Sequence, residues 1–173
     1  MIVDPEQGTV DSPLHPSQVV LLPAVPDALV RLADAGYGLV LVSNQPAAAK
    51  GKTTREDLEK VHEKVLELAQ ARGGLILSSH ICYHRREDEC TCRKPRTGLL
   101  EAAFQEHPAY ARESSWMVGD SLTDIQAGQA YGLKTAMLTP HKTETMEILK
   151  QQNVMPTLWA DDLEDFSKQL LKR

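Results

Sequence analysis

The amino-acid sequence predicts an α/β fold with a mostly parallel central sheet between two layers of helices, a three-layer α/β/α architecture of the Rossmann-like kind. Short apolar runs alternate with helical patterns along the chain, which is typical of strand–helix–strand units in a sheet covered on both faces. With 173 residues, of which 42% are hydrophobic, the chain can fill one core. It contains no linker, low-complexity tract or internal repeat, so we expect a single domain over residues 1–173.

The first half of the chain carries the clearest helix and strand signals. Apolar residues recur at helical spacing up to Gly36, and a continuous apolar run typical of a buried central strand follows. Thr54 opens a capping sequence, after which one apolar face continues to about Arg72. The elements expected here are a strand over 1–3, a helix over 26–35, a strand over 38–42, a helix over 54–72 and a strand near 75–83.

The second half continues the same alternation. The apolar run at 116–118 stops at Gly119 and Asp120, and helical patterns stand on either side of it. The elements expected here are a helix over 98–106, a strand over 116–118, a helix over 122–131, a strand over 135–138 and a helix over 163–172.

Charge and hydropathy exclude several classes of partner. The formal net charge is −5, with acidic and basic residues interleaved, which disfavours nucleic acid or an anionic membrane and favours a small-molecule ligand. No apolar run approaches the roughly 18 to 20 residues of a membrane span, and the first residues lack the features of a secretory signal. We therefore expect a soluble, cytoplasmic monomer.

The stretch between residues 82 and 92 contains every cysteine of the chain. Cys82, His84, Cys90 and Cys92 fall within eleven residues, and three sulfurs with one imidazole can form a tetrahedral Zn²⁺ site with bonds of about 2.0 to 2.3 Å. A closed shell of this kind leaves no position for water or substrate, so the zinc would order a loop. The alternatives are separate buried thiols beside a surface histidine, or a transient disulfide.

Polar residues follow several of the expected strands, at the sheet edge where open α/β proteins bind ligands. Asp4 and Ser43 follow the first two strands, Lys94 follows the cysteine-rich stretch, and Asp120 and Asp124 follow the strand at 116–118. Carboxylates, a hydroxyl and an ammonium group are the groups needed to hold Mg²⁺ and a phosphate together. Alternatively, Ser43 forms a turn, Lys94 is a surface lysine, and the two aspartates cap a helix.

Three segments resemble motifs two, three and four of the haloacid dehalogenase (HAD) superfamily. These are Ser43-Asn44-Gln45, the run 90–95 with its Arg93-Lys94-Pro95, and the run 118–127 that reads Val-Gly-Asp-Ser-Leu-Thr-Asp-Ile-Gln-Ala. More narrowly, they look like its zinc-loop phosphatases, the heptose-bisphosphate and histidinol-phosphate phosphatase family. The resemblance implies the HAD fold without a large cap domain.

The resemblance also implies a role for each matching residue. Asp4 would be the nucleophile and a Mg²⁺ ligand, Glu6 the general acid and base, and Ser43 and Lys94 the groups that bind the phosphoryl oxygens. Asp120 and Asp124 would complete the Mg²⁺ site. Asn44, Gln45 and Arg93 would contact substrate, and Cys82, His84, Cys90 and Cys92 would hold zinc.

The activity implied is Mg²⁺-dependent hydrolysis of a phosphate monoester through an aspartyl-phosphate. The expected substrate is a small phosphorylated sugar, D-glycero-D-manno-heptose 1,7-bisphosphate at its 7-phosphate, in making lipopolysaccharide core or related glycans. Histidinol phosphate, an amino-alcohol phosphate, is the alternative.

The first motif departs from the family pattern Asp-x-Asp-Gly-Thr, because residues 4–9 read Asp-Pro-Glu-Gln-Gly-Thr. Counting from Asp4 keeps a nucleophile and places Glu6 at the acid and base position. Counting back from Gly8 and Thr9 places Pro5 and Gln7 at those positions, and neither can do the chemistry. The second alignment would make the chain a catalytically impaired relative that acts as a binding module.

Overall fold

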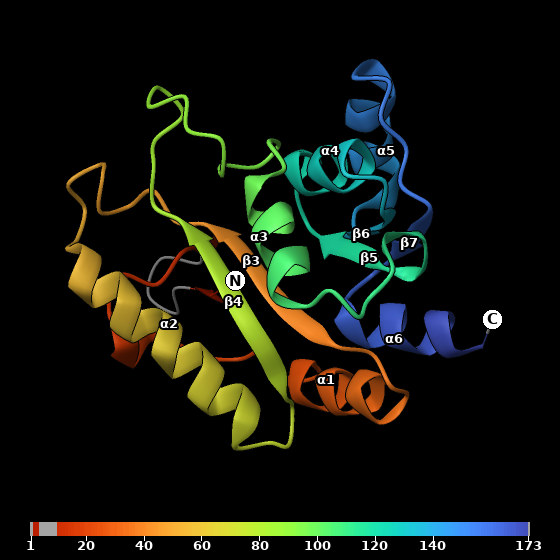
Figure 1. Ribbon diagram of the computed structural model, residues 1–173, viewed down its shortest axis with the longest axis horizontal. Coiled ribbons are helices and arrows are strands. Elements are labelled where there is room, and N and C mark those ends of the chain that lie inside the picture. The colour runs from red at the N-terminus through yellow and green to blue at the C-terminus, as the bar shows by residue number, and fades with distance from the viewer. Residues whose placement is uncertain (1, 4–9, 173) are drawn as a thin grey trace. The chain divides into compact units, whose positions relative to one another are not determined.

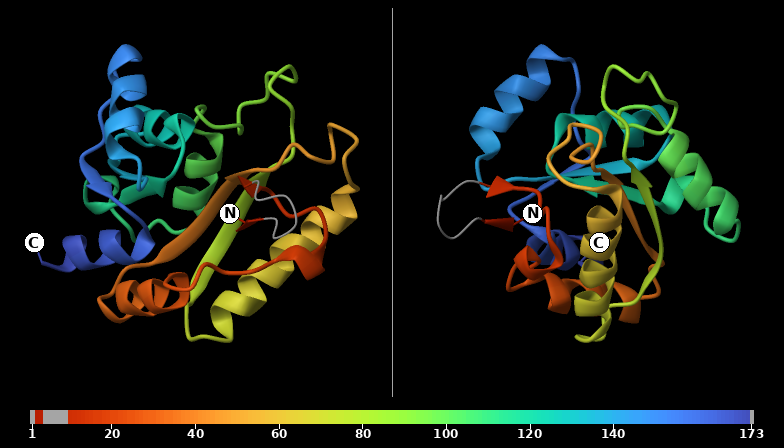
Figure 2. Two further views of the ribbon diagram at one scale, coloured as in Figure 1. Left: turned by 180° about the vertical axis from the view of Figure 1, so that it is seen from behind. Right: turned by 90° about the vertical axis from the view of Figure 1, so that its left-hand side faces the viewer.

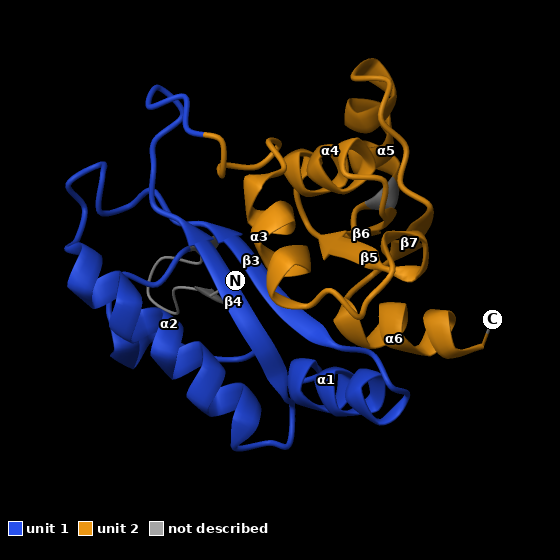
Figure 3. Cartoon of the chain, in the orientation of Figure 1, with its two compact units in different colours: residues 1–90 blue, residues 91–173 orange. Residues whose placement is uncertain are grey.

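The computed structural model describes residues 2–3 and 10–172 of the chain, and Figure 1 shows its helices and strands. It forms two compact units, residues 1–90 and residues 91–173 (Figure 3). Each unit contains parallel strands and helices, so the predicted α/β class is confirmed. The single domain over residues 1–173 stays a prediction.

The first unit is built around the parallel pair β3 (Leu39–Asn44) and β4 (Ile76–Cys82), which lie side by side in Figure 1. The connection between them contains α2 (Arg55–Gln70). The register sets Asn44 opposite Cys82, so the two strands end level with each other. α1 (Val25–Asp34) precedes β3, and a short helical turn η1 (Pro16–Gln18) precedes α1.

Local sequence explains where these helices begin and end. The Thr54 hydroxyl caps α2 by accepting the backbone N–H of Asp57 at 3.0 Å. Leu58, Val61 and Ala69 form the buried face of α2. α1 has a proline in its first turn, and Gly36 ends it with φ near +86°. The predicted elements between residues 26 and 83 are therefore confirmed to within a few residues.

The N-terminal strand has a partner that the sequence did not indicate. β1 (Ile2–Val3) pairs antiparallel with β2 (Val10–Asp11), and the two are the short red arrows of Figure 2. The expected strand over 1–3 is confirmed for Ile2 and Val3, and residue 1 lies outside the described residues. Its partner is only two residues long, too short for a periodic pattern to reveal it.

The second unit contains a parallel sheet in the order β5-β6-β7. Its elements are α3 (Gly98–Glu106), η2 (Arg112–Ser114), β5 (Trp116–Gly119), α4 (Leu122–Ala130), β6 (Lys134–Leu138), α5 (Lys142–Gln151), β7 (Leu158–Ala160) and α6 (Leu163–Leu171). The sequence predicted all of the longer elements except α5, and it missed β7, which has three residues.

Close packing of α4 on β5 and β6 fixes the end of β5. A Cβ on Gly128 would lie 2.6 Å from the Met117 Cβ and 2.7 Å from the Thr135 Cγ2, so the helix backbone approaches the sheet directly. Ile125 of α4 is fully buried in a cluster with Met137, Leu149 and Val154. This packing holds the first turn of α4 beside the carboxyl end of β5.

The described helices do not include a membrane span, since none of them is both long enough and apolar enough to cross a bilayer.

Candidate active site and metal centre

The predicted site residues stand at strand ends and in one loop. Asp4 and Glu6 lie outside the residues that the structure describes. Ser43 and Asn44 end β3 and Gln45 follows; Cys82 ends β4; His84, Cys90, Cys92, Arg93 and Lys94 lie between β4 and α3; Asp120 follows β5; and Asp124 lies in α4.

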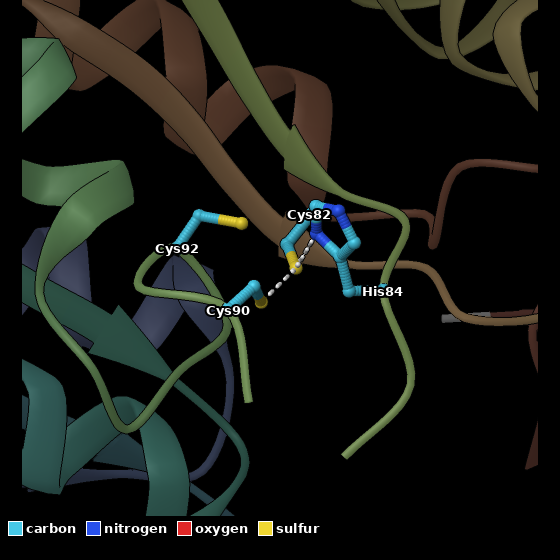
Figure 4. A group of neighbouring side chains, drawn as sticks. All are labelled: Cys82, His84, Cys90 and Cys92. Atoms are coloured by element: carbon cyan, nitrogen blue, oxygen red, sulfur yellow. Dashed lines mark hydrogen bonds between the residues drawn. The ribbon is translucent and has the colours of Figure 1, made fainter. Parts of the chain in front are cut away.

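The cysteines and His84 converge on one point (Figure 4). Their ligand atoms all lie within 4.8 Å of one another. The Cys82 Sγ is 3.6 Å from the His84 Nδ1 and 3.7 Å from the Cys90 Sγ. In a tetrahedral zinc site, bond lengths of about 2.0 to 2.3 Å give ligand separations of about 3.6 to 3.8 Å. These residues can therefore hold a metal ion of that size.

An aromatic contact holds the beginning of this loop against α2. The Arg55 guanidinium lies 4.6 Å from the centre of the Tyr83 ring, and Tyr83 stands between two of the clustered residues. Burial raises the pKa of the Tyr83 phenol, so the ring remains neutral beside the cation. The contact anchors the loop at a point next to Cys82 and His84.

Lys94 and Asp124 form a buried ion pair. The Lys94 Nζ lies 2.6 Å from the Asp124 Oδ1, and the two residues are only 8% and 5% exposed. The second carboxylate oxygen, Oδ2, accepts the Ser121 backbone N–H at 3.1 Å and the Ser121 hydroxyl at 2.7 Å. Lys94 is therefore not a surface lysine, whereas Asp124 does take part in capping α4, as one alternative supposed.

Two glycines permit this arrangement. A Cβ on Gly119 would collide with the Asp124 carboxylate, so the carboxylate lies directly against the end of β5. A Cβ on Gly98 would lie 2.8 Å from the Thr91 carbonyl oxygen, which accepts the Gly98 N–H at 3.2 Å. The segment that carries Arg93 and Lys94 is therefore closed into a tight turn between Thr91 and the start of α3.

Asp120 differs from Asp124 in its surroundings. It directly follows β5 and is exposed, whereas Asp124 is buried. Both lie next to Ser121, the N-cap of α4. Ser121 and Gly119 were not predicted to support the site, although the Ser-x-x-Asp spacing of a capping box is the signal that could have indicated the role of Ser121.

In the first unit, the Gln45 side chain forms a hydrogen bond with the Ser43 side chain. Its Nε2 donates to the Ser43 Oγ at 3.0 Å, and its backbone N–H donates to the Cys82 carbonyl at 2.7 Å. Ser43, Asn44 and Gln45 are all half-buried. The end of β3 is thereby connected to the residue at which the cysteine-rich loop begins.

Several known proteins are similar to this chain. A family model described as HAD-hydrolase-like matches residues 91–166. The D-glycero-beta-D-manno-heptose-1,7-bisphosphate 7-phosphatase of Neisseria meningitidis is 35% identical over 84% of this chain and 78% of its own length. The histidine biosynthesis bifunctional protein HisB of Legionella pneumophila is 37% identical over 76% of this chain, a match that spans 37% of that longer protein.

A solved structure resembles almost the whole chain. It is the crystal structure of D,D-heptose 1,7-bisphosphate phosphatase from B. bronchiseptica complexed with magnesium and phosphate. The TM-score is 0.83 at 27% identity, and the match covers 99% of this chain and 93% of that one.

The buried ion pair generates a stability prediction. Lys94→Met leaves the Asp124 carboxylate buried without its cation, so we expect the free energy of unfolding to fall by about 3 to 5 kcal/mol. The double variant Lys94→Met with Asp124→Asn removes both charges and keeps an acceptor for Ser121. Its free energy of unfolding should therefore fall by less than that of Lys94→Met. Urea unfolding measures both. The control is Lys168→Met, which breaks the partly exposed Lys168–Glu164 pair and should lower the free energy of unfolding by less than about 1 kcal/mol. Equal losses for Lys94→Met and the control would contradict the prediction.

Proposed function

Because the chain belongs to the HAD-like hydrolase family of the D-glycero-beta-D-manno-heptose-1,7-bisphosphate 7-phosphatases, we propose that it removes the 7-phosphate from D-glycero-D-manno-heptose 1,7-bisphosphate. The family consists of hydrolases that act on phosphoric monoesters. The observation that carries the proposal is the buried Lys94–Asp124 ion pair. It lies beside the end of β5, and Asp120 is the first residue after that strand.

Lys94 supplies positive charge for the phosphoryl group. Its ammonium is fixed by a carboxylate that is itself fixed by Ser121, so the charge needs little reorganisation when a phosphate arrives. The Ser43 hydroxyl would donate a hydrogen bond to a phosphoryl oxygen, and Arg93, Asn44 and Gln45 would contact the rest of the substrate. Phosphoryl transfer depends mainly on such positioning and charge stabilisation.

A magnesium ion fits the carboxylates at the end of β5. Mg²⁺ binds one or two carboxylates and retains several waters, and Asp120 is exposed, as that coordination requires. Asp124 is buried, and its oxygens are already engaged by Lys94 and Ser121. With Asp4 as a further ligand, the bound ion would neutralise charge that develops on the phosphoryl oxygens.

The residues proposed for the covalent step come from the sequence. An oxygen of the Asp4 carboxylate would attack phosphorus while Glu6 gives a proton to the departing sugar oxygen. Water, deprotonated by Glu6, would then hydrolyse the aspartyl-phosphate and release inorganic phosphate. If instead Pro5 and Gln7 occupy these positions, the chain binds phosphorylated ligands without turnover.

The alternative substrate is histidinol phosphate. It is favoured by the HisB relative, which is slightly more identical to this chain than the heptose-bisphosphate relative is, 37% against 35%. Against it, that match leaves most of the bifunctional protein uncovered.

We predict that the purified chain with Mg²⁺ releases phosphate from the heptose bisphosphate with a higher kcat/KM than from histidinol phosphate. Asp4→Asn and Asp120→Asn should each lower the rate at least about 100-fold, because they remove a nucleophile and a charge that act in the transition state. A phosphate-release assay compares the three proteins. If the parent chain turns over neither ester, the assignment as an active enzyme is wrong.

The cluster formed by Cys82, His84, Cys90 and Cys92 is proposed to bind a structural Zn²⁺. Three thiolates and an imidazole at these separations suit zinc, and they close its coordination shell. The ion would supply binding energy that stabilises the folded loop.

We predict that the chain is purified with one zinc ion and that His84→Gln weakens zinc binding on the order of 100-fold, since it removes one ligand of the closed shell. The matched control is His107→Gln, which changes a histidine outside the cluster. Metal analysis and the thermal midpoint should change only for His84→Gln. A zinc content that is the same for both variants would refute the assignment.

A further inference from the structure

The last residues of β3 hold one side chain in place with another. Residues two apart in a strand lie on the same face, so Gln45, which continues the line of β3, lies on the same face as Ser43. Its side-chain amide folds back and donates to the Ser43 Oγ at 3.0 Å. The contact is local and needs no other element to bring the two side chains together.

The backbone of Gln45 is held as well. Its N–H donates to the Cys82 carbonyl at 2.7 Å, which extends the β3–β4 pairing one residue beyond Asn44. Pro46 follows, and a proline disfavours helical backbone in the residue before it. The chain then turns at once, with the Lys50 N–H donating to the Pro46 carbonyl at 3.0 Å. The Gln45 backbone N–H is thus held by the Cys82 carbonyl, and its side-chain amide is held by the Ser43 hydroxyl.

This direction of the hydrogen bond determines what the Ser43 hydroxyl can do. A hydroxyl has one proton and two lone pairs, and the amide of Gln45 occupies a lone pair. The Ser43 proton therefore remains available to an acceptor. We propose that Gln45 is a positioning residue that orients the Ser43 hydroxyl as a donor to a phosphoryl oxygen. This inference rests on the proposed function, and it gives Gln45 a role in addition to the contact with substrate proposed above.

The proposal is tested by reversing the donor and acceptor of the Gln45–Ser43 hydrogen bond. In Gln45→Glu, the introduced carboxylate accepts the Ser43 proton and repels an anion, so we expect inorganic phosphate to bind roughly 10- to 100-fold more weakly at pH 8 in the presence of Mg²⁺. In Gln45→Met, which has similar length and no donor, we expect a loss of roughly 3- to 10-fold. The matched control is Gln70→Glu, which makes the same charge change at the exposed end of α2 and should bind as the parent does. Calorimetry measures the affinities.

The pH dependence separates this role from a structural one. As the pH falls towards the carboxyl pKa of about 4.3, the introduced group becomes protonated and can donate again. The ratio of parent to Gln45→Glu affinity should therefore shrink, whereas the ratio for Gln45→Met should stay constant. Circular dichroism confirms that the variants are folded.

The outcomes distinguish the two proposals. If the parent binds phosphate and hydrolyses the ester, but both Gln45 variants bind within about twofold of it, the positioning role is wrong and the proposed function stands. A Gln45→Glu defect that is independent of pH also overturns the positioning role. If the parent neither binds phosphate nor hydrolyses an ester, the proposed function fails and the positioning role fails with it.

Discussion

The ion pair between Lys94 and Asp124 is the interaction on which the candidate site depends. Burying two opposite charges costs several kcal/mol per ion unless close geometry and additional hydrogen bonds compensate. Here the charges are 2.6 Å apart, and Ser121 donates two hydrogen bonds to the same carboxylate. The absence of a side chain at Gly119 makes room for that carboxylate. The pair thus holds a loop and the first turn of α4 to one another beside the end of β5.

The cysteine-rich loop begins and ends beside the groups proposed to bind phosphate. Its first clustered residue, Cys82, accepts the backbone N–H of Gln45, which in turn donates to Ser43. Its last, Cys92, precedes Lys94 by two positions. A metal ion bound in the loop would therefore order the chain next to both Ser43 and Lys94, without contacting substrate.

The sequence was sufficient to predict the features that depend on residues close to one another in the chain. The capped helix α2, the strands β3 and β4 and the cluster around Cys82 follow from spacing over a few residues, and the structure agrees with them. It could not predict the burial of Lys94, because that depends on pairing with Asp124, thirty positions away. Nor did it predict β7, a strand that follows closely after Pro156, a residue typical of loops, or the support that Gly119 gives to Asp124. The roles of Asp4 and Glu6 stay predictions.

The most direct measurement is a crystal structure of the chain with Mg²⁺ and inorganic phosphate. The ion-pair account predicts that the Lys94 Nζ lies within hydrogen-bonding distance of a phosphate oxygen while keeping its contact with the Asp124 Oδ1, and that an Asp120 oxygen binds the metal. A phosphate bound away from Lys94, or an Asp124 carboxylate that has left Lys94 to bind the metal, would contradict it.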